Sequence, residues 1–384
     1  MLMKIIRSKL FIILIVAIIS LVYGIMLVNY KIFPYSILKY VQDEFAFRYW
    51  LVRPDSNKEQ IYAIDEEYKK VDVRALITIN SEKDFVSKRK QLIKLIFKKD
   101  DLDYLSIPEE VVRVNDDRYS DLSSLRSIDK MTIRMDFGLE SISYLFKPVK
   151  SNNRLLIYHE RHPGGIISGK NTIRFFLKKG FSVLAFTMPL QGMNNKPYVT
   201  LERFGRFKLR RHEHLKFIDS PIKPFVEPVV VALNYIFKEY NFRDISMVGI
   251  SGGASTAYLV AAIDKRVQYS FPVAGGYPIF LKSNDDQCEG DFEQNWPELY
   301  KVANYLELFV LGSFGEGRKQ VQIFNKYETD SCGGLKFRLY DKVVSEIIER
   351  NMKGSFKVLS DDTHKDHKIS SYALKMILGE LELY

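Results

Sequence analysis

Five residues near the middle of the chain have the types and spacing that a serine nucleophile requires. Gly249-Ile250-Ser251-Gly252-Gly253 follows a short apolar run and opens an apolar helical pattern that ends at Ile263. A serine on a sharp strand-to-helix turn has a strained backbone, which neighbours without side chains permit. The first turn of the following helix offers unpaired N–H groups to a developing oxyanion. The pattern therefore predicts Ser251 as a nucleophile and the N–H of Gly252 as an oxyanion donor.

A glycine-rich turn between a strand and a helix has another common use. It can bind a phosphate, or simply allow close packing. A phosphate-binding loop typically has Lys after its last glycine, where this chain has Ala254. The composition of the turn thus favours the nucleophile over the phosphate site.

The elements that must position this turn alternate between strands and helices. Strand patterns occur at 131–135, 142–146, 154–159, 181–187, 245–250, 267–274, 320–324 and 356–359. Helical patterns occur at 172–179, 224–240, 254–263, 292–311 and 371–383. The first two strands, separated by Asp136-Phe137-Gly138, are predicted to form a hairpin. The alternation that follows predicts an α/β fold, with a mostly parallel central sheet and helices on both faces.

The order of three signals resembles the α/β-hydrolase superfamily. A Gly-x-Ser-x-Gly motif follows one strand, acidic residues follow the next-but-one strand, and histidines follow the last strand. The resemblance covers about Lys130 to Tyr384. It implies an α/β-hydrolase fold and a serine esterase that forms an acyl-enzyme on Ser251, without a cofactor.

The resemblance also implies which residues activate the serine. His367, just before the final helix, is the implied base, and His364 is the alternative. Asp330 is the implied orienting carboxylate, and Glu328 is the alternative. Asp361 and its neighbour Asp362 follow the last strand, which is the wrong place for this carboxylate, so they are expected only to solvate their loop.

The second oxyanion donor is implied to come from the loop after the 154–159 strand. The N–H of Glu160 is the first choice and that of Arg161 the alternative. The loop reads His159-Glu160-Arg161-His162-Pro163-Gly164-Gly165, which departs from the His-Gly-Gly-Gly form found in the family. His159 or His162 is instead a candidate for substrate contact.

A basic and aromatic insert at about 198–221 interrupts the alternation of strands and helices. Its His212 and His214 have no carboxylate or third histidine at ligand spacing, so the sequence predicts no metal site. We expect the insert to form a small cap over the active site and to favour an apolar or anionic ligand.

The N-terminus contains a charge-free run from Leu10 to Tyr30, preceded by Lys4, Arg7 and Lys9. This run is long and apolar enough to predict a transmembrane anchor, with a cleavable signal peptide as the alternative. The denser positive charge before the run predicts a hydrolase domain on the non-cytoplasmic side. The absence of an Asn-x-Ser/Thr sequence fits a bacterial inner-membrane protein.

Three parts follow from these patterns: an anchor at 1–30, a linker and helical region at 31–129, and the hydrolase domain at 130–384. In the second part, Ser81 and Asp84 resemble a capping box before an amphipathic helix whose Lys-rich face is expected to be solvated. The two cysteines exclude a disulfide framework and a cysteine-only zinc site, but they allow one bridge if the domain is exported.

Composition limits the range of partners. The chain has 384 residues, of which 46% are hydrophobic, and a net charge of +10. Its basic residues are scattered, so no nucleic-acid partner is predicted. The expected substrate is a small molecule or an acylated glycan or lipid. Two other functions remain open: acyl transfer by the same residues, and an inactive hydrolase fold that serves as a tethered binding module. The sequence predicts no oligomeric state.

Overall fold

The structure is a computed structural model that describes residues 14–26, 64, 66–102, 106–202, 205–282, 288–329, 331–351 and 354–382. The chain divides into two compact units, Met1–Ile61 and Tyr62–Tyr384. In the first unit, the described residues form a helix over 14–26. No helix in the described ranges combines the length and apolar character that a bilayer crossing needs. The rest of the predicted span lies outside the described residues, and the anchor stays a prediction.

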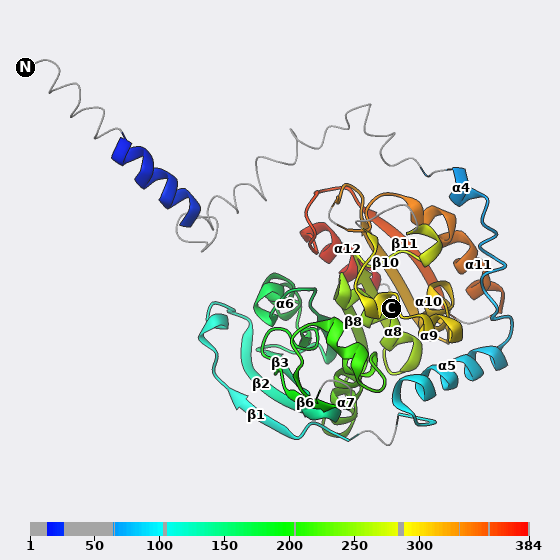
Figure 1. The fold of residues 1–384 in the computed structure, drawn as a ribbon, viewed down its shortest axis with the longest axis horizontal. Coiled ribbons are helices and arrows are strands. Elements are labelled where there is room, and N and C mark those ends of the chain that lie inside the picture. Colours follow the sequence, from blue (N-terminus) through cyan, green and yellow to red (C-terminus); the bar gives the residue numbers. More distant parts are fainter. Residues whose placement is uncertain are drawn as a thin grey trace, which may run out of the picture. The chain divides into compact units, whose positions relative to one another are not determined.

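The second unit is built on a nine-stranded mixed sheet (Figure 1) with the order β1-β2-β3-β5-β4-β8-β9-β10-β11. Antiparallel pairs join β1, β2, β3 and β5, and the remaining neighbours are parallel. The predicted hairpin and the mostly parallel sheet are thus confirmed. The strands are β1 Glu110–Val114, β2 Leu125–Arg134, β3 Glu140–Pro148, β4 Arg154–His159, β5 Ser182–Phe186, β8 Asp244–Ile250, β9 Tyr269–Val273, β10 Lys319–Asn325 and β11 Ser355–Asp361.

Helices cover both faces of the sheet. Residues of β4 alternate between two apolar clusters, because neighbouring side chains of a strand point to opposite faces. Leu155 and Ile157 belong to the cluster with the helices α5, α7, α8, α10 and α11, whereas Leu156 and Tyr158 belong to the cluster with α6 and α12. The helices are α4 Glu66–Lys69, α5 Glu82–Phe97, α6 Lys170–Lys178, α7 Lys223–Glu239, α8 Gly252–Ile263, α9 Pro297–Val302, α10 Tyr305–Ser313, α11 Asp341–Asn351 and α12 Ser371–Glu382.

Helix α5 packs beside α8 and α9 within the second unit (Figure 1). Its capping box, Ser81 with Asp84, is present as predicted. The Lys-rich face that was predicted to be solvated includes Arg89, and for this residue the prediction is wrong. Arg89 is buried and donates to Ala262 O and Leu311 O at 2.8 and 3.0 Å. These carbonyls lie in the last turns of α8 and α10, where a cation favourably meets the negative ends of the helix dipoles.

One region differs from the sequence prediction, and the structure adds detail to the insert. The region 292–311 is not one helix but three pieces: the 3₁₀ helix η8 (Phe292–Gln294), α9 and α10. Pro297 begins α9 and Asn304 caps α10 through a capping box, which accounts for the breaks. The insert forms a two-stranded sheet, β6 (Tyr198–Leu201) with β7 (Gly205–Lys208), followed by the 3₁₀ helix η5 (His212–Phe217).

Candidate active site

Ser251 stands on the turn between β8 and α8, in the conformation that the sequence predicts. Its φ is 57° and its ψ is −121°, a region that non-glycine residues rarely adopt. Close packing explains the glycines around it. A Cβ on Gly249 would lie 1.9 Å from the carbonyl oxygen of Gly253, and a Cβ on Gly253 would lie 2.3 Å from that of His159. The turn therefore needs both glycines.

Ser251 is partly exposed and lies in a pocket of about 360 Å³ at the carboxyl ends of the parallel strands. His367 lies in the same pocket, although 116 residues separate it from the serine in the sequence. Ligand sites of doubly wound sheets lie at this edge, since the loops after the strands converge there. The other lining residues are His162, Ala274, Gly276, Cys288, Gly290, Asp291, Gln294, Ser331 and Cys332.

A buried carboxylate holds the far side of the His367 ring. The Nδ1 atom of His367 contacts Oε1 of Glu328, whose side chain is fully buried. The second oxygen of Glu328 accepts a hydrogen bond of 2.8 Å from the amide of Asn325, at the end of β10. The carboxylate is therefore fixed from both sides. With Nδ1 engaged, Nε2 is the ring nitrogen left to accept a proton from a nucleophile.

The other two candidates for these roles are placed differently. Asp330, the predicted orienting carboxylate, lies outside the described residues. His364, the alternative base, is buried, and its Nε2 lies 3.3 Å from Oδ2 of Asp361. It is not one of the residues that line the pocket of Ser251.

Asp361 was expected only to solvate its loop, and this prediction is wrong. Its side chain is fully buried at the end of β11. Burial alone would raise the pKa of this carboxyl group, but contacts with His364, Ser370 and Thr363 outweigh burial and lower the pKa to about 2. The Thr363 N–H and hydroxyl and the Ser370 hydroxyl all donate to the carboxylate. Asp361 thus closes the loop that carries His367.

The predicted oxyanion donors are only partly available. Gly252 begins α8, where N–H groups have no partner within the helix. The prediction for Glu160 is wrong in this structure, because its N–H continues the ladder between strands and donates to Phe186 O at 3.1 Å. The N–H of Arg161, the alternative, donates to Glu160 Oε1 at 3.0 Å. A substrate would have to displace that carboxylate to reach the Arg161 N–H.

Glu160 and Arg161 connect the loop after β4 to its surroundings. The Glu160 carboxylate is buried and accepts a hydrogen bond of 2.9 Å from Tyr158. Burial is the main reason that the pKa of Glu160 is raised. The guanidinium of Arg161 donates to the backbone carbonyl of His367. The two loops on either side of the serine are therefore tied together.

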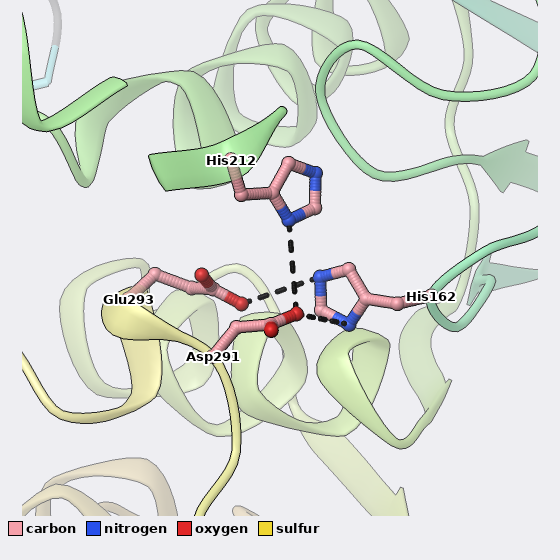
Figure 2. Close-up of side chains that lie close together, drawn as sticks. All are labelled: His162, His212, Asp291 and Glu293. Carbon is pink, nitrogen blue, oxygen red and sulfur yellow. Dashed lines mark ion pairs between the residues drawn. The ribbon is translucent and has the colours of Figure 1, made fainter. Parts of the chain in front are cut away.

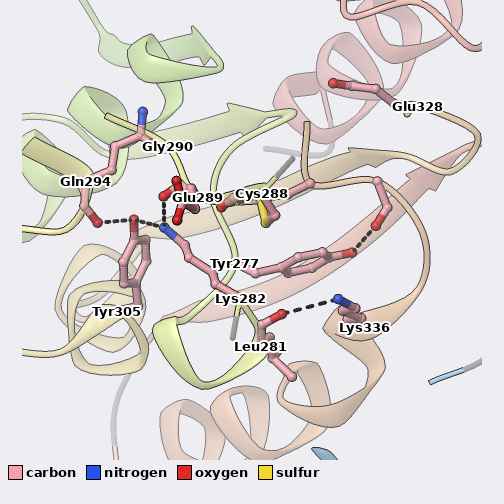
Figure 3. Close-up of a disulfide and its surroundings, with 12 residues drawn as sticks. Tyr277, Leu281, Lys282, Cys288, Glu289, Gly290, Gln294, Tyr305, Glu328 and Lys336 are labelled. Atoms are coloured by element: carbon pink, nitrogen blue, oxygen red, sulfur yellow. Dashed lines mark hydrogen bonds between the residues drawn. A yellow bond between two sulfur atoms is a disulfide. The ribbon is translucent and has the colours of Figure 1, made fainter. Parts of the chain in front are cut away.

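The two cysteines form a disulfide beside the pocket (Figure 3). Cys288 and Cys332 belong to the segments that follow β9 and β10, and their Cα atoms lie 4.6 Å apart. Tyr277 and Lys336 add hydrogen bonds between the same two segments, to Gly333 O and Leu281 O. The bridge that the sequence allowed therefore fixes the pocket wall close to Glu328.

A further cluster of side chains could bind a metal ion, and it has no signature in the sequence. His162, His212, Asp291 and Glu293 point toward one another (Figure 2), and one ligand atom from each lies within 4.8 Å of the others. The residues come from the loop after β4, from η5, and from the segment around η8. Because three distant segments supply them, no spacing in the sequence could have indicated the cluster. His212 was the one member considered as a ligand.

No protein-family model matches the chain. No curated protein sequence matches it. Among solved structures, an acetyl xylan esterase from Paenibacillus sp. R4 has a TM-score of 0.53 at 15% identity, over 81% of this chain and 98% of that one. A methylesterase has a TM-score of 0.50 at 14% identity, over 84% and 65% of the two chains. The Pyrococcus furiosus esterase Pf2001 has a TM-score of 0.48 at 15% identity, over 73% and 99%.

These likenesses concern the fold, since the identities are low. The mostly parallel sheet with helices on both faces fits the α/β-hydrolase architecture of the neighbouring esterases. The order of the elements agrees with the resemblance noted in the sequence. A fold of this kind hosts many activities, so the function must be argued from the site.

Proposed function

We propose that the chain is a serine hydrolase that cleaves carboxylic esters. One observation carries the proposal: Ser251, on its strained turn, shares a pocket with His367, whose Nδ1 is held by the buried Glu328. A nucleophile, a base and an orienting carboxylate on three separate loops are the set that acyl transfer requires. In this proposal Glu328, and not Asp330, is the orienting carboxylate.

The reaction proceeds in two halves. Nε2 of His367 takes the proton of the Ser251 hydroxyl as its oxygen attacks the ester carbonyl, and the N–H of Gly252 stabilises the resulting oxyanion. The C–O bond to the leaving group breaks, and His367 gives its proton to the departing alcohol. Water then attacks the acyl-enzyme with the same histidine as base, the bond between the acyl carbon and Ser251 Oγ breaks, His367 returns the proton to Oγ, and the carboxylic acid leaves. Glu328 stays ionised and stabilises the imidazolium in both halves.

The proposed substrate carries a short acyl or alkyl ester. A pocket of about 360 Å³ lies near the lower end of the range of roughly 300 to 1,000 Å³ for small-molecule sites. Two structural neighbours are named as an acetyl xylan esterase and a methylesterase. Both act on esters with a small group on one side of the bond, which agrees with this size. The name of the acetyl xylan esterase supports a glycan as the carrier of the ester.

Active-site labelling tests the proposal directly. The purified chain should react with a fluorophosphonate probe and hydrolyse p-nitrophenyl acetate. Ser251→Ala should abolish labelling and lower kcat by at least about 10³-fold. Ser255→Ala, one helical turn further along α8, is the matched control and should keep both activities. Unlabelled folded protein, or labelling that survives Ser251→Ala, would refute the proposal.

We also propose that the N-terminal run tethers the hydrolase domain to the outer side of a bacterial inner membrane. The charge-free stretch from Leu10 to Tyr30 and the basic residues before it support this location. The disulfide Cys288–Cys332 supports it independently, because such bonds persist in oxidising compartments. Cell fractionation, with protease treatment of spheroplasts, should find the chain in the membrane fraction and its domain degraded. Recovery in the cytosolic fraction would contradict both points.

A further inference from the structure

We infer that His162, His212, Asp291 and Glu293 form a binding site for one divalent transition-metal ion, with zinc as the best fit, next to the active-site pocket. The four ligand atoms lie within 4.8 Å of one another (Figure 2). Imidazole nitrogens suit zinc and related metals, whereas calcium and magnesium prefer oxygen ligands throughout. Two imidazoles and two carboxylates are sufficient for four-coordinate zinc.

The hydrogen bonding of His212 leaves one ring nitrogen facing the cluster. Its Nε2 lies 2.7 Å from the carbonyl oxygen of Pro189. A carbonyl only accepts, so Nε2 carries a proton. In the neutral ring, Nδ1 then presents a lone pair toward Asp291 Oδ2, which is 3.9 Å away. Two facing lone pairs repel each other unless a cation lies between them. Fixing a ligand ring through its second nitrogen is typical of metal sites.

A cation at this place would be shielded from water, because the His212 side chain is only 4% exposed. A divalent ion would neutralise the two carboxylates that face the ring.

Glu293 provides the second, independent observation. Its side chain is 5% exposed, yet neither of its carboxylate oxygens has a hydrogen-bond partner in the described ranges. Oε1 lies 3.2 Å from Nε2 of His162, but this nitrogen makes no hydrogen bond either. The two atoms are close enough for a hydrogen bond but are not aligned for one. A buried carboxylate without partners is strongly unfavourable.

The separations within the cluster are near those that a bound metal ion requires. Metal–ligand bonds of about 2.1 Å in a tetrahedral site place the ligand atoms roughly 3.4 Å apart. The His162 ring faces Asp291 Oδ2 with Nδ1 at 3.4 Å and Glu293 Oε1 with Nε2 at 3.2 Å. An ion would bind one of these nitrogens, so only one of the two distances joins two of its ligand atoms. The distance from His212 Nδ1 to Asp291 Oδ2 is 3.9 Å, which a bound ion would shorten.

The position of the site gives the ion a structural role in the pocket wall. A Cβ on Gly252 would lie 2.0 Å from Cε1 of His162, so the ring packs directly on the start of α8. His162 and Asp291 also line the pocket of Ser251. An ion at this place would tie the loop after β4, the insert and the η8 segment together. It would hold the wall next to the oxyanion donor.

Metal content tests the inference without reference to activity. The full-length chain, purified without chelators or thiols, should contain equimolar zinc. After removal of zinc with dipicolinic acid, it should bind zinc again with a sub-micromolar Kd, measured against a chromogenic chelator. Cobalt(II) should give the visible absorption of a tetrahedral site. His212→Ala and Glu293→Gln should each weaken zinc binding at least tenfold.

Two control variants locate the ion. His214→Ala removes the other histidine of η5, which accepts a hydrogen bond from Arg210 N, and should leave zinc affinity unchanged. Ser251→Ala should also keep its zinc, so that failure of the proposed esterase and failure of the metal site are distinguishable. Wild-type protein that takes up neither zinc nor cobalt would overturn the inference. Unchanged affinity in both His212→Ala and Glu293→Gln would do so as well. Wild-type binding and the near-isosteric Glu293→Gln decide the question even if His212→Ala fails to fold.

Discussion

The Arg161 guanidinium donates a hydrogen bond to the backbone carbonyl of His367, across 206 residues of sequence. The contact connects the loop after β4 to the loop after β11, and these loops flank Ser251. The backbone N–H of Arg161 is itself held by the buried Glu160. The position of the proposed base thus depends on a side chain from the opposite side of the pocket.

Replacing Arg161 should therefore slow the reaction without weakening substrate binding. Arg161→Gln should lower kcat about tenfold and leave KM within about twofold, because a charged hydrogen bond of roughly 1.5 to 3 kcal/mol no longer fixes the His367 loop. Arg161→Lys should restore part of kcat. Steady-state kinetics with p-nitrophenyl acetate measures both constants. Arg174→Gln, which removes an ion pair between α6 and Asp121, is the control. An unchanged kcat in Arg161→Gln would exclude this positioning role.

Glu328 and Asp330 can be distinguished by isosteric substitution. Glu328→Gln should lower kcat by about 10³-fold or more, since an amide cannot stabilise the imidazolium of His367. Asp330→Asn should keep kcat within about threefold. Circular dichroism would verify that both variants fold. The reverse outcome would return the orienting role to Asp330.

The glycines of the serine turn should be far less tolerant of substitution than an exposed helix glycine. Gly249→Ala places a Cβ 1.9 Å from Gly253 O, and should lower the free energy of unfolding by about 3 kcal/mol. Gly379→Ala in α12 meets no atom within 4 Å and should raise it by about 0.5 to 1 kcal/mol. Urea denaturation measures both. Equal stability of the two variants would contradict the tight packing of the turn.

Asp361 should make the fold sensitive to acid. Its pKa is about 2 in the folded chain, below the ordinary value of 3.8, so its stabilising effect is present above pH 4 and is lost as the pH falls toward 2. The loss should amount to about 2 kcal/mol. Urea denaturation at several pH values should show a flatter pH dependence in Asp361→Asn than in wild type. Asp362→Asn, at the exposed neighbouring position, should retain the wild-type slope. Identical slopes for all three proteins would disprove the effect.

Reducing the disulfide should destabilise the second unit. Cys288 and Cys332 are 44 residues apart, and a bridge over this distance should stabilise the fold by about 4 kcal/mol, because it lowers the conformational entropy of the unfolded chain. This value is an upper bound, because the native state can relax when the bond is reduced. Thermal unfolding with and without a phosphine reductant should show a Tm lower by several degrees in the reduced form. The double variant Cys288→Ser/Cys332→Ser is the control, and its Tm should not respond to the reductant. A Tm that reduction leaves unchanged in the wild type would count against a stabilising bond.

Local sequence patterns identified most of the sheet. The bounds of β4 match the prediction because its apolar run is continuous, and β8 was identified for the same reason. The helix α11 was not predicted, although Val344, Ile347 and Ile348 recur at helical spacing and are buried. The strand β1 falls in the predicted linker region. Its alternation of apolar and polar residues is short, and what makes it a strand is its pairing with β2, which the local sequence does not reveal.

The site was predictable only where a motif fixes the backbone. Ser251 has a signature of its own, because the turn dictates the residues around it. The choice between Glu328 and Asp330 depends on the path of the chain after β10, which Asn325 and His367 determine through hydrogen bonds. The N–H of Glu160 donates to Phe186 O because β4 and β5 continue to pair beyond His159. The sequence of one strand does not show how far its pairing with a neighbour extends.

The depth to which α5 is built into the second unit limits how far the chain can be shortened. A version that starts at Lys130, the predicted domain boundary, would lack β1, half of β2 and the Arg89 side chain that holds Ala262 O and Leu311 O. It would expose a new sheet edge, which favours aggregation. It would also leave the carbonyl groups at the ends of α8 and α10 without the Arg89 guanidinium that they accept from. Crystallisation and labelling experiments on a truncated chain should therefore begin near Tyr62, where the compact unit itself begins.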